Sequence, residues 1–440
     1  DKLDKEELIR QINQMHKQGM GGFFMHPRGG LKDEYLGDEF MGAVKACVQE
    51  AKRLGMKAWL YDEDRFPSGS AGGKVVQDDP EYGAKALEML EIPCNQVKKD
   101  DTILKIYSVT KDNGILKYND ITEKPQHELE QLHGSVWVFR IIYMHSQSNC
   151  NNKPYTDICY KDAIDKFIQV THEKYKESVK EYFGNTVPGI FTDEPSFNVV
   201  TSGKNYLPWT HEYEKHFQKR KGYCILEHMP ELFFDVGNYK KVRFDFWDVF
   251  TRLFNENFVK NIYDWCENND LNFTGHYWEH AFPNPTHSGS VMPHYEFMQY
   301  PGIDMLFNTK EEGEQVGNDL IVKEVSSVGN QLDKERILSE TYGASGWDLS
   351  LAEMKRVADW QFALGINLIC QHLVLYSMNG YRKRDFPLSH MDHQPYWNCY
   401  HLIADYLGRM SYVMSQGKYV GDVLVLHPSS STWAEFNTLD

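Results

Sequence analysis

The stretch Val187-Pro188-Gly189-Ile190-Phe191-Thr192 runs directly into Asp193-Glu194-Pro195. A second apolar stretch, Arg336-Ile337-Leu338-Ser339, runs into Glu340 in the same way. Each pattern predicts a short buried strand that stops at a carboxylate. Burying a carboxylate is costly unless it has a partner or a task, and barrels of parallel strands place their chemistry at the carboxyl ends of the strands. The two stretches therefore predict strands of one barrel whose acidic ends face a common site.

The segments around these two strands alternate between strand and helix patterns. Strands are predicted at 21–25, 57–61, 187–192, 271–275, 303–307, 336–339 and 367–375. Amphipathic helices are predicted at 4–18, 38–54, 162–184, 243–268, 308–330, 350–364 and 395–415. This alternation predicts parallel strands with right-handed crossovers. The expected fold is α/β, a (β/α)8 TIM barrel.

Residues 85–150 break the alternation. Segments 103–109, 115–118 and 135–143 alternate or run apolar, and Asp-Asn-Gly at 112–114 is a hairpin signal. We expect a small β-rich insertion here, and we expect it to contain the third barrel strand.

The chain is therefore divided into four parts by the strand and helix pattern. Residues 1–84 form the first part of the barrel, 85–150 the insertion, and 151–418 the remainder. Gly421 to Pro428 predicts one more buried strand, so 419–440 is interpreted as the truncated start of a further, C-terminal α/β domain.

Chain length limits the number of domains, and net charge argues against binding to nucleic acids and membranes. The 440 residues suit two or three domains or one enlarged barrel. The net charge of -16 repels phosphate backbones and anionic lipids, and no apolar stretch approaches the roughly 20 residues that span a bilayer. We expect neither a nucleic acid nor a membrane partner. The chain opens at Asp1, and we interpret it as a fragment from which a targeting segment was removed.

Polar residues follow the predicted strands at their carboxyl ends. They are His26, Arg28, Asp62, Glu63, Arg65, Asp193, Glu194, His276, Trp278, Glu279, Glu340, Tyr342 and His372. Glycoside cleavage requires one carboxylic acid kept protonated and a second one ionised, and crowding of carboxylates raises the pKa of one of them. We predict a sugar-cleaving enzyme with Glu194 as general acid and Glu340 as second carboxylate. Glu279 is the alternative for the second role.

The remaining strand-end residues suit sugar binding. Aromatic rings pack on the C–H faces of sugars, which makes Trp278, Trp347, Trp209 and Tyr342 candidate platforms. Candidate partners of sugar hydroxyls are His26, Arg28, Asp62, Glu63, Arg65, Asp193, His276 and His372. Each of these residues has a structural role as its alternative.

Metal chemistry is a further alternative. His276 and His280 have i, i+4 spacing, but Pro283 and Pro285 follow closely, so the segment is not an H-E-x-x-H helix. A zinc hydrolase would use this histidine-rich segment. Calcium held by carboxylate and carbonyl oxygens fits an acidic rim better. The eight scattered cysteines form no C-x-x-C pair and are expected to be reduced and mostly buried.

Several motifs resemble bacterial enzymes related to glycoside hydrolase family 106, the α-L-rhamnosidases. They are Gly21-Gly22-Phe23-Phe24-Met25-His26-Pro27-Arg28-Gly29-Gly30, Trp59-Leu60-Tyr61-Asp62-Glu63, Pro67-Ser68-Gly69, Ala71-Gly72-Gly73, Phe191-Thr192-Asp193-Glu194-Pro195 and Ser339-Glu340. The resemblance covers residues 1–430. It implies a bacterial (β/α)8 glycosidase that acts on a plant or microbial glycan with calcium and inversion. The location, cytoplasmic or periplasmic, stays open.

Two other functions are also open. In the wider clan of retaining barrels, the acid/base follows strand four and the nucleophile strand seven, which Glu194 and Glu340 match in order; a β-galactosidase-like retaining enzyme is therefore an alternative. A carbohydrate-binding barrel that has lost catalysis is another, although the three strand-end glutamates argue against it. The sequence leaves the oligomeric state unassigned.

Overall fold

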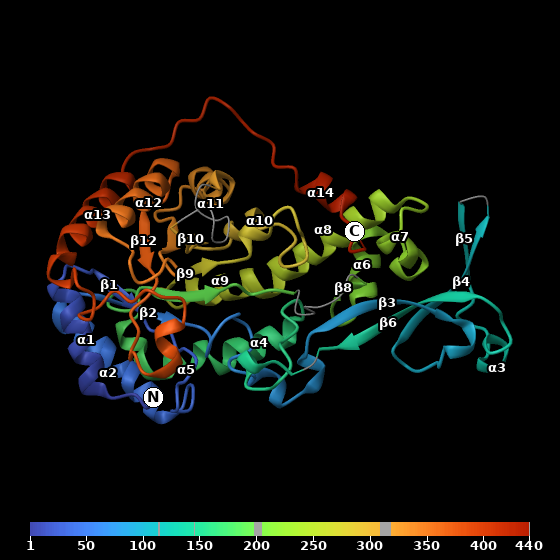
Figure 1. Ribbon diagram of the computed structural model, residues 1–440, viewed down its shortest axis with the longest axis horizontal. Coiled ribbons are helices and arrows are strands. Elements are labelled where there is room, and N and C mark those ends of the chain that lie inside the picture. Colours follow the sequence, from blue (N-terminus) through green and yellow to red (C-terminus); the bar gives the residue numbers. More distant parts are fainter. Residues whose placement is uncertain (113–114, 145, 198–204, 309–317, 440) are drawn as a thin grey trace.

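The computed structural model describes residues 1–112, 115–144, 146–197, 205–308 and 318–439. Its centre is a curled sheet of seven parallel strands (Figure 1). In sheet order the strands are β1 (Gly22–Phe24), β2 (Lys57–Tyr61), β7 (Gly189–Asp193), β9 (Asn272–His276), β10 (Tyr300–Met305), β11 (Leu338–Thr341) and β12 (Leu368–Gln371). The predicted α/β class and the barrel-like arrangement are confirmed.

Helices cover the outer face of this sheet (Figure 1). The longer ones are α1 (Lys5–Lys17), α2 (Asp38–Leu54), α4 (Lys161–Val170), α5 (His172–Val179), α8 (Tyr239–Phe254), α9 (Lys260–Glu267), α11 (Asp319–Gln331), α12 (Leu351–Leu364) and α13 (Tyr400–Met414). Their ends follow local chemistry. Asp4 caps α1, Ser350 and Glu353 form a capping box on α12, and left-handed Gly55 ends α2.

Two helices predicted as continuous are interrupted. The helix expected over 162–184 breaks at Thr171, whose hydroxyl donates to the Phe167 carbonyl, and ends in a 3-10 turn, Lys180–Tyr182. The helix expected over 243–268 contains one π-helical turn, Asn255–Val259, between α8 and α9.

The third barrel strand predicted within 85–150 is wrong. β2 pairs directly with β7, with Leu60 opposite Ile190. The strands of that segment form a separate antiparallel sheet instead, which in order contains β5 (Ile115–Asp120), β4 (Ile103–Asp112), β6 (Ser135–Tyr143), β3 (Lys85–Pro93) and β8 (Tyr206–Trp209). β3 and β6 pair over nine residues, and each has a second antiparallel neighbour in this sheet, β8 beside β3 and β4 beside β6. Both strands are therefore interior strands of this sheet, not of the barrel. Gly114 of the hairpin signal lies outside the described residues.

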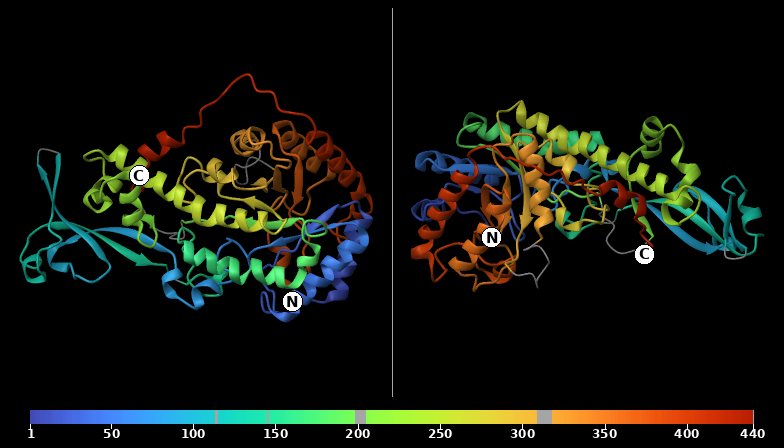
Figure 2. Two further views of the ribbon diagram at one scale, coloured as in Figure 1. Left: turned by 180° about the vertical axis from the view of Figure 1, so that it is seen from behind. Right: turned by 90° about the horizontal axis from the view of Figure 1, so that it is seen from above.

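This second sheet projects to one side of the barrel (Figure 2). Aromatic rings fasten it to the helices beyond β8. Trp137 stacks on Phe234 with ring centroids 3.9 Å apart, and Phe139 lies 5.7 Å from Phe233. The other helices of the fold are α3 (Gln126–Leu129), α6 (Tyr213–Lys221), α7 (Met229–Phe233), α10 (Met292–Tyr295) and α14 (Ser429–Glu435).

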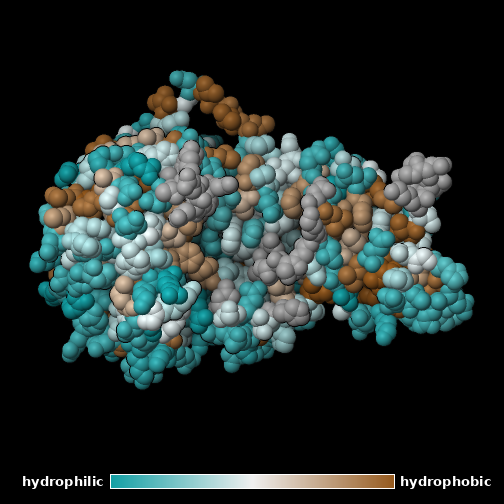
Figure 3. All heavy atoms as spheres, viewed as in Figure 1, coloured by the Kyte–Doolittle hydropathy of each residue, from teal (hydrophilic) through white to brown (hydrophobic). Residues whose placement is uncertain are grey.

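The strand predicted at 421–428 does not form. This segment is extended, arches away from the barrel (Figure 1), and ends where α14 packs against α8. Leu424 and Leu426 are 89% and 90% exposed, and the apolar colour of the arch is visible in Figure 3. A strand needs a neighbouring strand edge to pair its backbone, and the segment contacts none.

Two further expectations concern cysteines and membranes. All eight cysteines are unpaired, and Cys47, Cys94, Cys150, Cys159 and Cys266 are buried. Within the described residues, every helix is too short or too polar to cross a bilayer.

Gly275 allows the close approach of β9 to β7 that positions the site. Its φ is +123°, and a Cβ there would lie 1.9 Å from the Thr192 carbonyl oxygen. We expect Gly275→Ala to lower the free energy of unfolding by at least about 3 kcal/mol, measured by urea denaturation. The matched control is Gly134→Ala, because Gly134 has φ +97° and an empty Cβ position; it should lose only about 1 kcal/mol. Equal losses would contradict the steric argument.

Candidate active site

Asp193 and Glu194 end the fully buried strand β7 and are held there by β9. Glu194 has φ +44°, a left-handed turn that stops the strand. Its amide donates to the carbonyl of His276 at 3.2 Å, and its carbonyl accepts from the Trp278 indole at 2.9 Å. The two acidic side chains are therefore presented from a rigid strand end, as the sequence predicts.

A first group of side chains joins β7, β9 and β11 around one imidazole. His276 Nε2 lies 2.9 Å from Glu340 Oε2 and 3.8 Å from Asp193 Oδ1. The Tyr61 hydroxyl, at the end of β2, donates to Asp193 Oδ2 at 2.5 Å. His372 Nε2, just after β12, lies 3.6 Å from Glu340 Oε1. Four strand ends and one following residue thus converge on one cluster.

The electrostatics of this group favour an imidazolium and a carboxylate. Burial lowers the pKa of His276, but the bond to Glu340 and the charge of Asp193 outweigh it and raise that pKa well above its usual range. Burial acts to raise the pKa of Glu340, yet the His276 hydrogen bond outweighs it, so that pKa is lowered. Glu340 is therefore held ionised.

A second group lies beside the first and lacks a cation. Atoms of Glu194, His280 and Asp304 lie within 4.8 Å of one another. Burial first, and then neighbouring carboxylates, raise the pKa values of Glu194 and Asp304 well above their usual range. Burial lowers the pKa of His280 to about 4, so this imidazole is neutral near pH 7. The two pKa shifts run in opposite directions: burial and neighbouring carboxylates favour the protonated form of Glu194, whereas the His276 hydrogen bond favours the ionised form of Glu340.

Two predicted site carboxylates are occupied by backbone amides. Glu279 is 1% exposed, and its oxygens accept from the amides of Tyr277 and Asp304. Glu63 is 3% exposed and accepts amides of Asp64, Gly69, Ser70 and Ala71 at 2.7–3.1 Å, and also that of Gly72. These contacts correct the predicted catalytic role of Glu279 and the predicted sugar-binding role of Glu63. Both residues shape loops beside the site.

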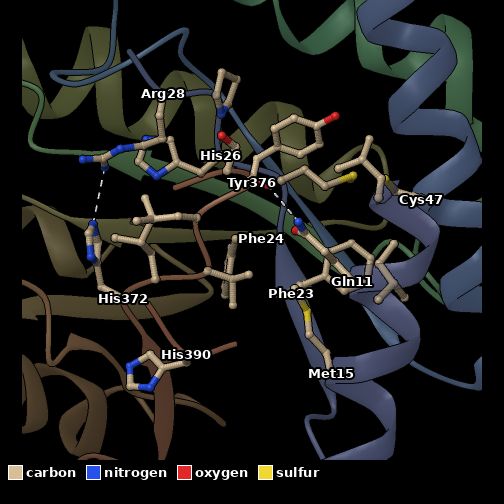
Figure 4. Close-up of a pocket in the computed structure, with 18 of the residues that line it drawn as sticks. Gln11, Met15, Phe23, Phe24, His26, Arg28, Cys47, His372, Tyr376 and His390 are labelled. Atoms are coloured by element: carbon tan, nitrogen blue, oxygen red, sulfur yellow. Dashed lines mark hydrogen bonds between the residues drawn. The ribbon is translucent and has the colours of Figure 1, made fainter. Parts of the chain in front are cut away.

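Arg28 and His26 line the rim near β12 (Figure 4). Arg28 forms two bonds to Asp385, at 2.8 and 2.7 Å, and approaches His372 Nε2 at 3.4 Å. The His26 ring stacks on Tyr61 with centroids 3.6 Å apart. The charge of Arg28 is thus largely compensated by Asp385.

The other predicted sugar-binding residues divide into rim and core. Trp278 stacks on His287 beside Glu194, and Trp347 is 38% exposed. Tyr342 is fully buried and donates to the Met354 carbonyl at 2.8 Å, so the predicted platform role is wrong. The same correction applies to Trp209, which is 5% exposed in the second sheet. Tyr342 directly follows β11 and Trp209 ends β8, and at both positions the ring is enclosed by the hydrophobic core, which leaves no face for a sugar.

Asp62 and Arg65 also serve the protein itself. Asp62 is fully buried and accepts from the Ser68 hydroxyl at 2.5 Å. Arg65 donates to the Ser148 carbonyl and the Asn151 side chain at 3.1 and 3.0 Å. The same Ser68 hydroxyl accepts from the Asp193 amide at 2.8 Å, so Asp62 supports the end of β7 from within the protein. The contacts shown for both side chains are with protein groups, and their contact with sugar stays a prediction.

Two groups of side chains bring possible metal ligands together. Within the described residues, two groups of three bring nitrogen and oxygen atoms within 4.8 Å: Asp193, His276 and Glu340, and Glu194, His280 and Asp304. Each offers two carboxylates, whereas Ca²⁺ takes six to eight oxygens. Neither group is by itself a calcium site. The four histidines from 276 to 294 do not gather either: His287 stacks on Trp278, and His294 bonds the Ser288 carbonyl. The zinc alternative is thereby weakened.

Sequence reasoning missed Tyr61, Asp304 and Asp385. Asp304 gives a usable signal, because it is an acidic residue inside the apolar stretch Gly302-Ile303-Asp304-Met305. Tyr61 and Asp385 give none, since their partners Asp193 and Arg28 come from distant parts of the chain.

The fold and the cluster define a class of protein: barrel-like α/β proteins with carboxyl groups at the strand ends whose pKa values are shifted in opposite directions. Residues 136–437 match glycoside hydrolase family 106, described as α-L-rhamnosidase. Because this match covers more than half of the chain, the protein belongs to that family.

Two similar proteins extend the comparison. A protein of Formosa agariphila named "Putative beta-glucuronidase" is 25% identical over 288 residues, covering 61% of this chain and 22% of its own length. The rhamnosidase of Novosphingobium sp. PP1Y shares the fold, with a TM-score of 0.66 and 12% identity over 94% of this chain and 58% of its own. The present chain thus spans only part of each.

The contacts of Glu279 predict a loss of stability on its substitution. In Glu279→Gln one amide-accepting oxygen becomes a donor, which leaves a buried N–H unpaired. We expect the free energy of unfolding to fall by about 1–3 kcal/mol, measured by urea denaturation. Glu177→Gln on α5 is the control, because that side chain is 71% exposed; its loss should stay within about 0.5 kcal/mol. Unchanged stability of Glu279→Gln would contradict the assigned role.

Proposed function

We propose that this protein is a glycoside hydrolase that removes a terminal sugar from a plant or microbial glycan, with an α-L-rhamnoside as first substrate. The observation that supports it most is the opposed protonation of Glu194 and Glu340. Glycoside cleavage uses one acid and one ionised carboxylate. The family and the rhamnosidase-like fold agree with this proposal.

In the proposed reaction Glu194 donates its proton to the glycosidic oxygen while the bond from that oxygen to the anomeric carbon breaks. Glu340, ionised beside His276, either attacks the anomeric carbon or removes a proton from the attacking water. Both routes need the same charge on Glu340. Trp278 maintains the backbone position of Glu194.

A neutral sugar suits this site better than a uronic acid. The cluster contains Asp193, Glu194, Asp304 and Glu340, and the nearby guanidinium of Arg28 is already bound to Asp385. Among the described residues of the site, a substrate carboxylate would meet like charges without a free cation. This favours a rhamnoside over the glucuronide in the name of the relative.

For the fold, we propose a barrel of eight strands. β1 and β12 are the two edges of the seven-stranded sheet, and both border a largely apolar cavity of about 320 Å³ (Figure 4). One more strand between them would complete the (β/α)8 arrangement. The second sheet would then be an insertion into this barrel.

The proposed acid and base are tested by substitution. We expect Glu194→Gln and Glu340→Gln each to lower kcat about 10²–10⁴-fold, because a Gln can neither donate a carboxylic proton nor carry a negative charge. Activity is measured on nitrophenyl glycosides, including α-L-rhamnoside, β-D-galactoside and β-D-glucuronide. Retained circular dichroism and melting temperature show that the variants are folded. Near wild-type turnover by either variant would refute its role.

The same panel separates the alternatives. Proton NMR of the first-formed product distinguishes inversion, as in family 106, from a retaining β-galactosidase-like reaction. Binding of sugars without turnover by the wild type, changed only modestly in both variants, would support an inactive carbohydrate-binding barrel instead.

The calcium requirement implied by the resemblance is also a proposal, and no residue is assigned to the ion. We expect dialysis against EDTA to remove activity and calcium alone to restore it, with bound calcium counted by elemental analysis. Restoration by zinc but not calcium would support the zinc hydrolase. Full activity of the metal-free protein would remove calcium from the proposal.

A further inference from the structure

Asp304 belongs to the cluster, and the reaction proposed above does not use it. We propose that Asp304 is the positioning residue that keeps Glu194 protonated: the two carboxyl groups lie too close for both to ionise, so the pair retains one proton between them. The inference rests on the proposed role of Glu194 as general acid. It adds a residue that sets the pH range over which Glu194 can donate its proton.

The position of Asp304 is rigid. It lies on β10, between β9 and β11, and is 5% exposed. Its backbone amide is held by Glu279, which follows β9. The carboxyl group is thus brought within 4.8 Å of Glu194 and His280, and its Oδ1 has no hydrogen-bond partner among the described residues.

Most of the described titratable groups around Glu194 and Asp304 are acidic, and none of them is a cation paired with either carboxyl group. Those that face it are Asp193 from β7, His276, Glu279 and His280 from β9 and the turn after it, and Glu340 from β11. Within the described residues, His276 is the sole cation of this set, and its Nε2 is bound to Glu340. His280 is neutral.

Two buried carboxyl groups in such surroundings cannot both ionise cheaply. The loss of the first proton places a negative charge beside the second group, and the second proton is then held more tightly. The aspartate thereby delays ionisation of Glu194, and Glu279 serves this arrangement by fixing the β10 backbone.

The kinetic test compares the pH dependence of kcat/KM in wild type and Asp304→Asn. Asparagine keeps the shape but removes the ionising neighbour. We expect the basic limb of the profile, where Glu194 loses its proton, to move to lower pH by about one unit or more, with the acidic limb in place. Asp157→Asn is the control, since Asp157 is likewise buried but accepts its hydrogen bonds from Thr210, Cys159 and His211, none of which belongs to the cluster; its basic limb should not move. If Asp304→Asn lowers kcat/KM by the same factor at every pH, the proposal is overturned.

A stability test needs no substrate and so separates this inference from the proposed function. A carboxyl whose pKa is higher in the folded protein stabilises it below the unfolded pKa, about 4, and loses that contribution as pH rises. The melting temperature of the wild type should therefore fall more steeply above pH 4 than that of Asp304→Asn or Glu194→Gln. Because the pair retains one proton between its two members, the effects should not add. The double variant should reduce the pH dependence of the melting temperature by less than the sum of the reductions in the two single variants.

The outcomes are distinct. Parallel melting curves for wild type and both single variants would overturn the shared proton even if the enzyme is active. If the melting temperature of the wild type falls more steeply above pH 4 than that of the variants, but no glycoside is hydrolysed, the carboxyl pair is upheld and the proposed hydrolase is refuted. If Asp304→Asn does not fold, Glu194→Gln tests the same pair from its other member.

Discussion

The bond between His276 and Glu340 is the interaction on which the rest of the site depends. It joins β9 to β11 across β10 and places a positive charge among buried carboxyl groups. Without that charge, Asp193 and Glu340 would be two unpaired acids in the interior, which is costly. With it, the hydrogen bond lowers the pKa of Glu340 and favours its ionised form, while burial and neighbouring carboxylates raise the pKa of Glu194. The division of labour between the two carboxyl groups thus follows from which of them the imidazole reaches.

The protein buries many acids, and it stabilises them in different ways. Glu63 and Glu279 accept backbone amides, which fixes the loops that end at the site. Asp193 accepts from a tyrosine hydroxyl and Asp62 from a serine hydroxyl. Asp304 differs, because its Oδ1 has no hydrogen-bond partner among the described residues and its carboxyl group lies beside that of Glu194. A group that lacks such compensation in an otherwise satisfied cluster is a functional candidate on physical grounds.

The membership in glycoside hydrolase family 106 and the fold likeness to a rhamnosidase at 12% identity fit this picture. A curled parallel sheet needs apolar strands of the right length, which many sequences supply, whereas the chemistry needs particular groups at the strand ends. The charge of the cluster adds an argument about substrate that family membership does not contain. The proposed preference for a sugar without a carboxylate rests on this array of carboxyl groups, whose neighbouring guanidinium is bound to Asp385.

The sequence by itself determined the α/β class, most strands and helices, and the residues that end them, because periodicity, caps and strand-end carboxylates are local signals. Glu194, Glu340 and His276 are identified this way. It could not show that residues 85–150 pair among themselves, since register depends on which edges are available. Nor could it separate Glu340 from Glu279, or platform tryptophans from core ones. Tertiary structure decided those points, because a carboxyl group is made acid, base or loop anchor by the partners that reach it from distant strands.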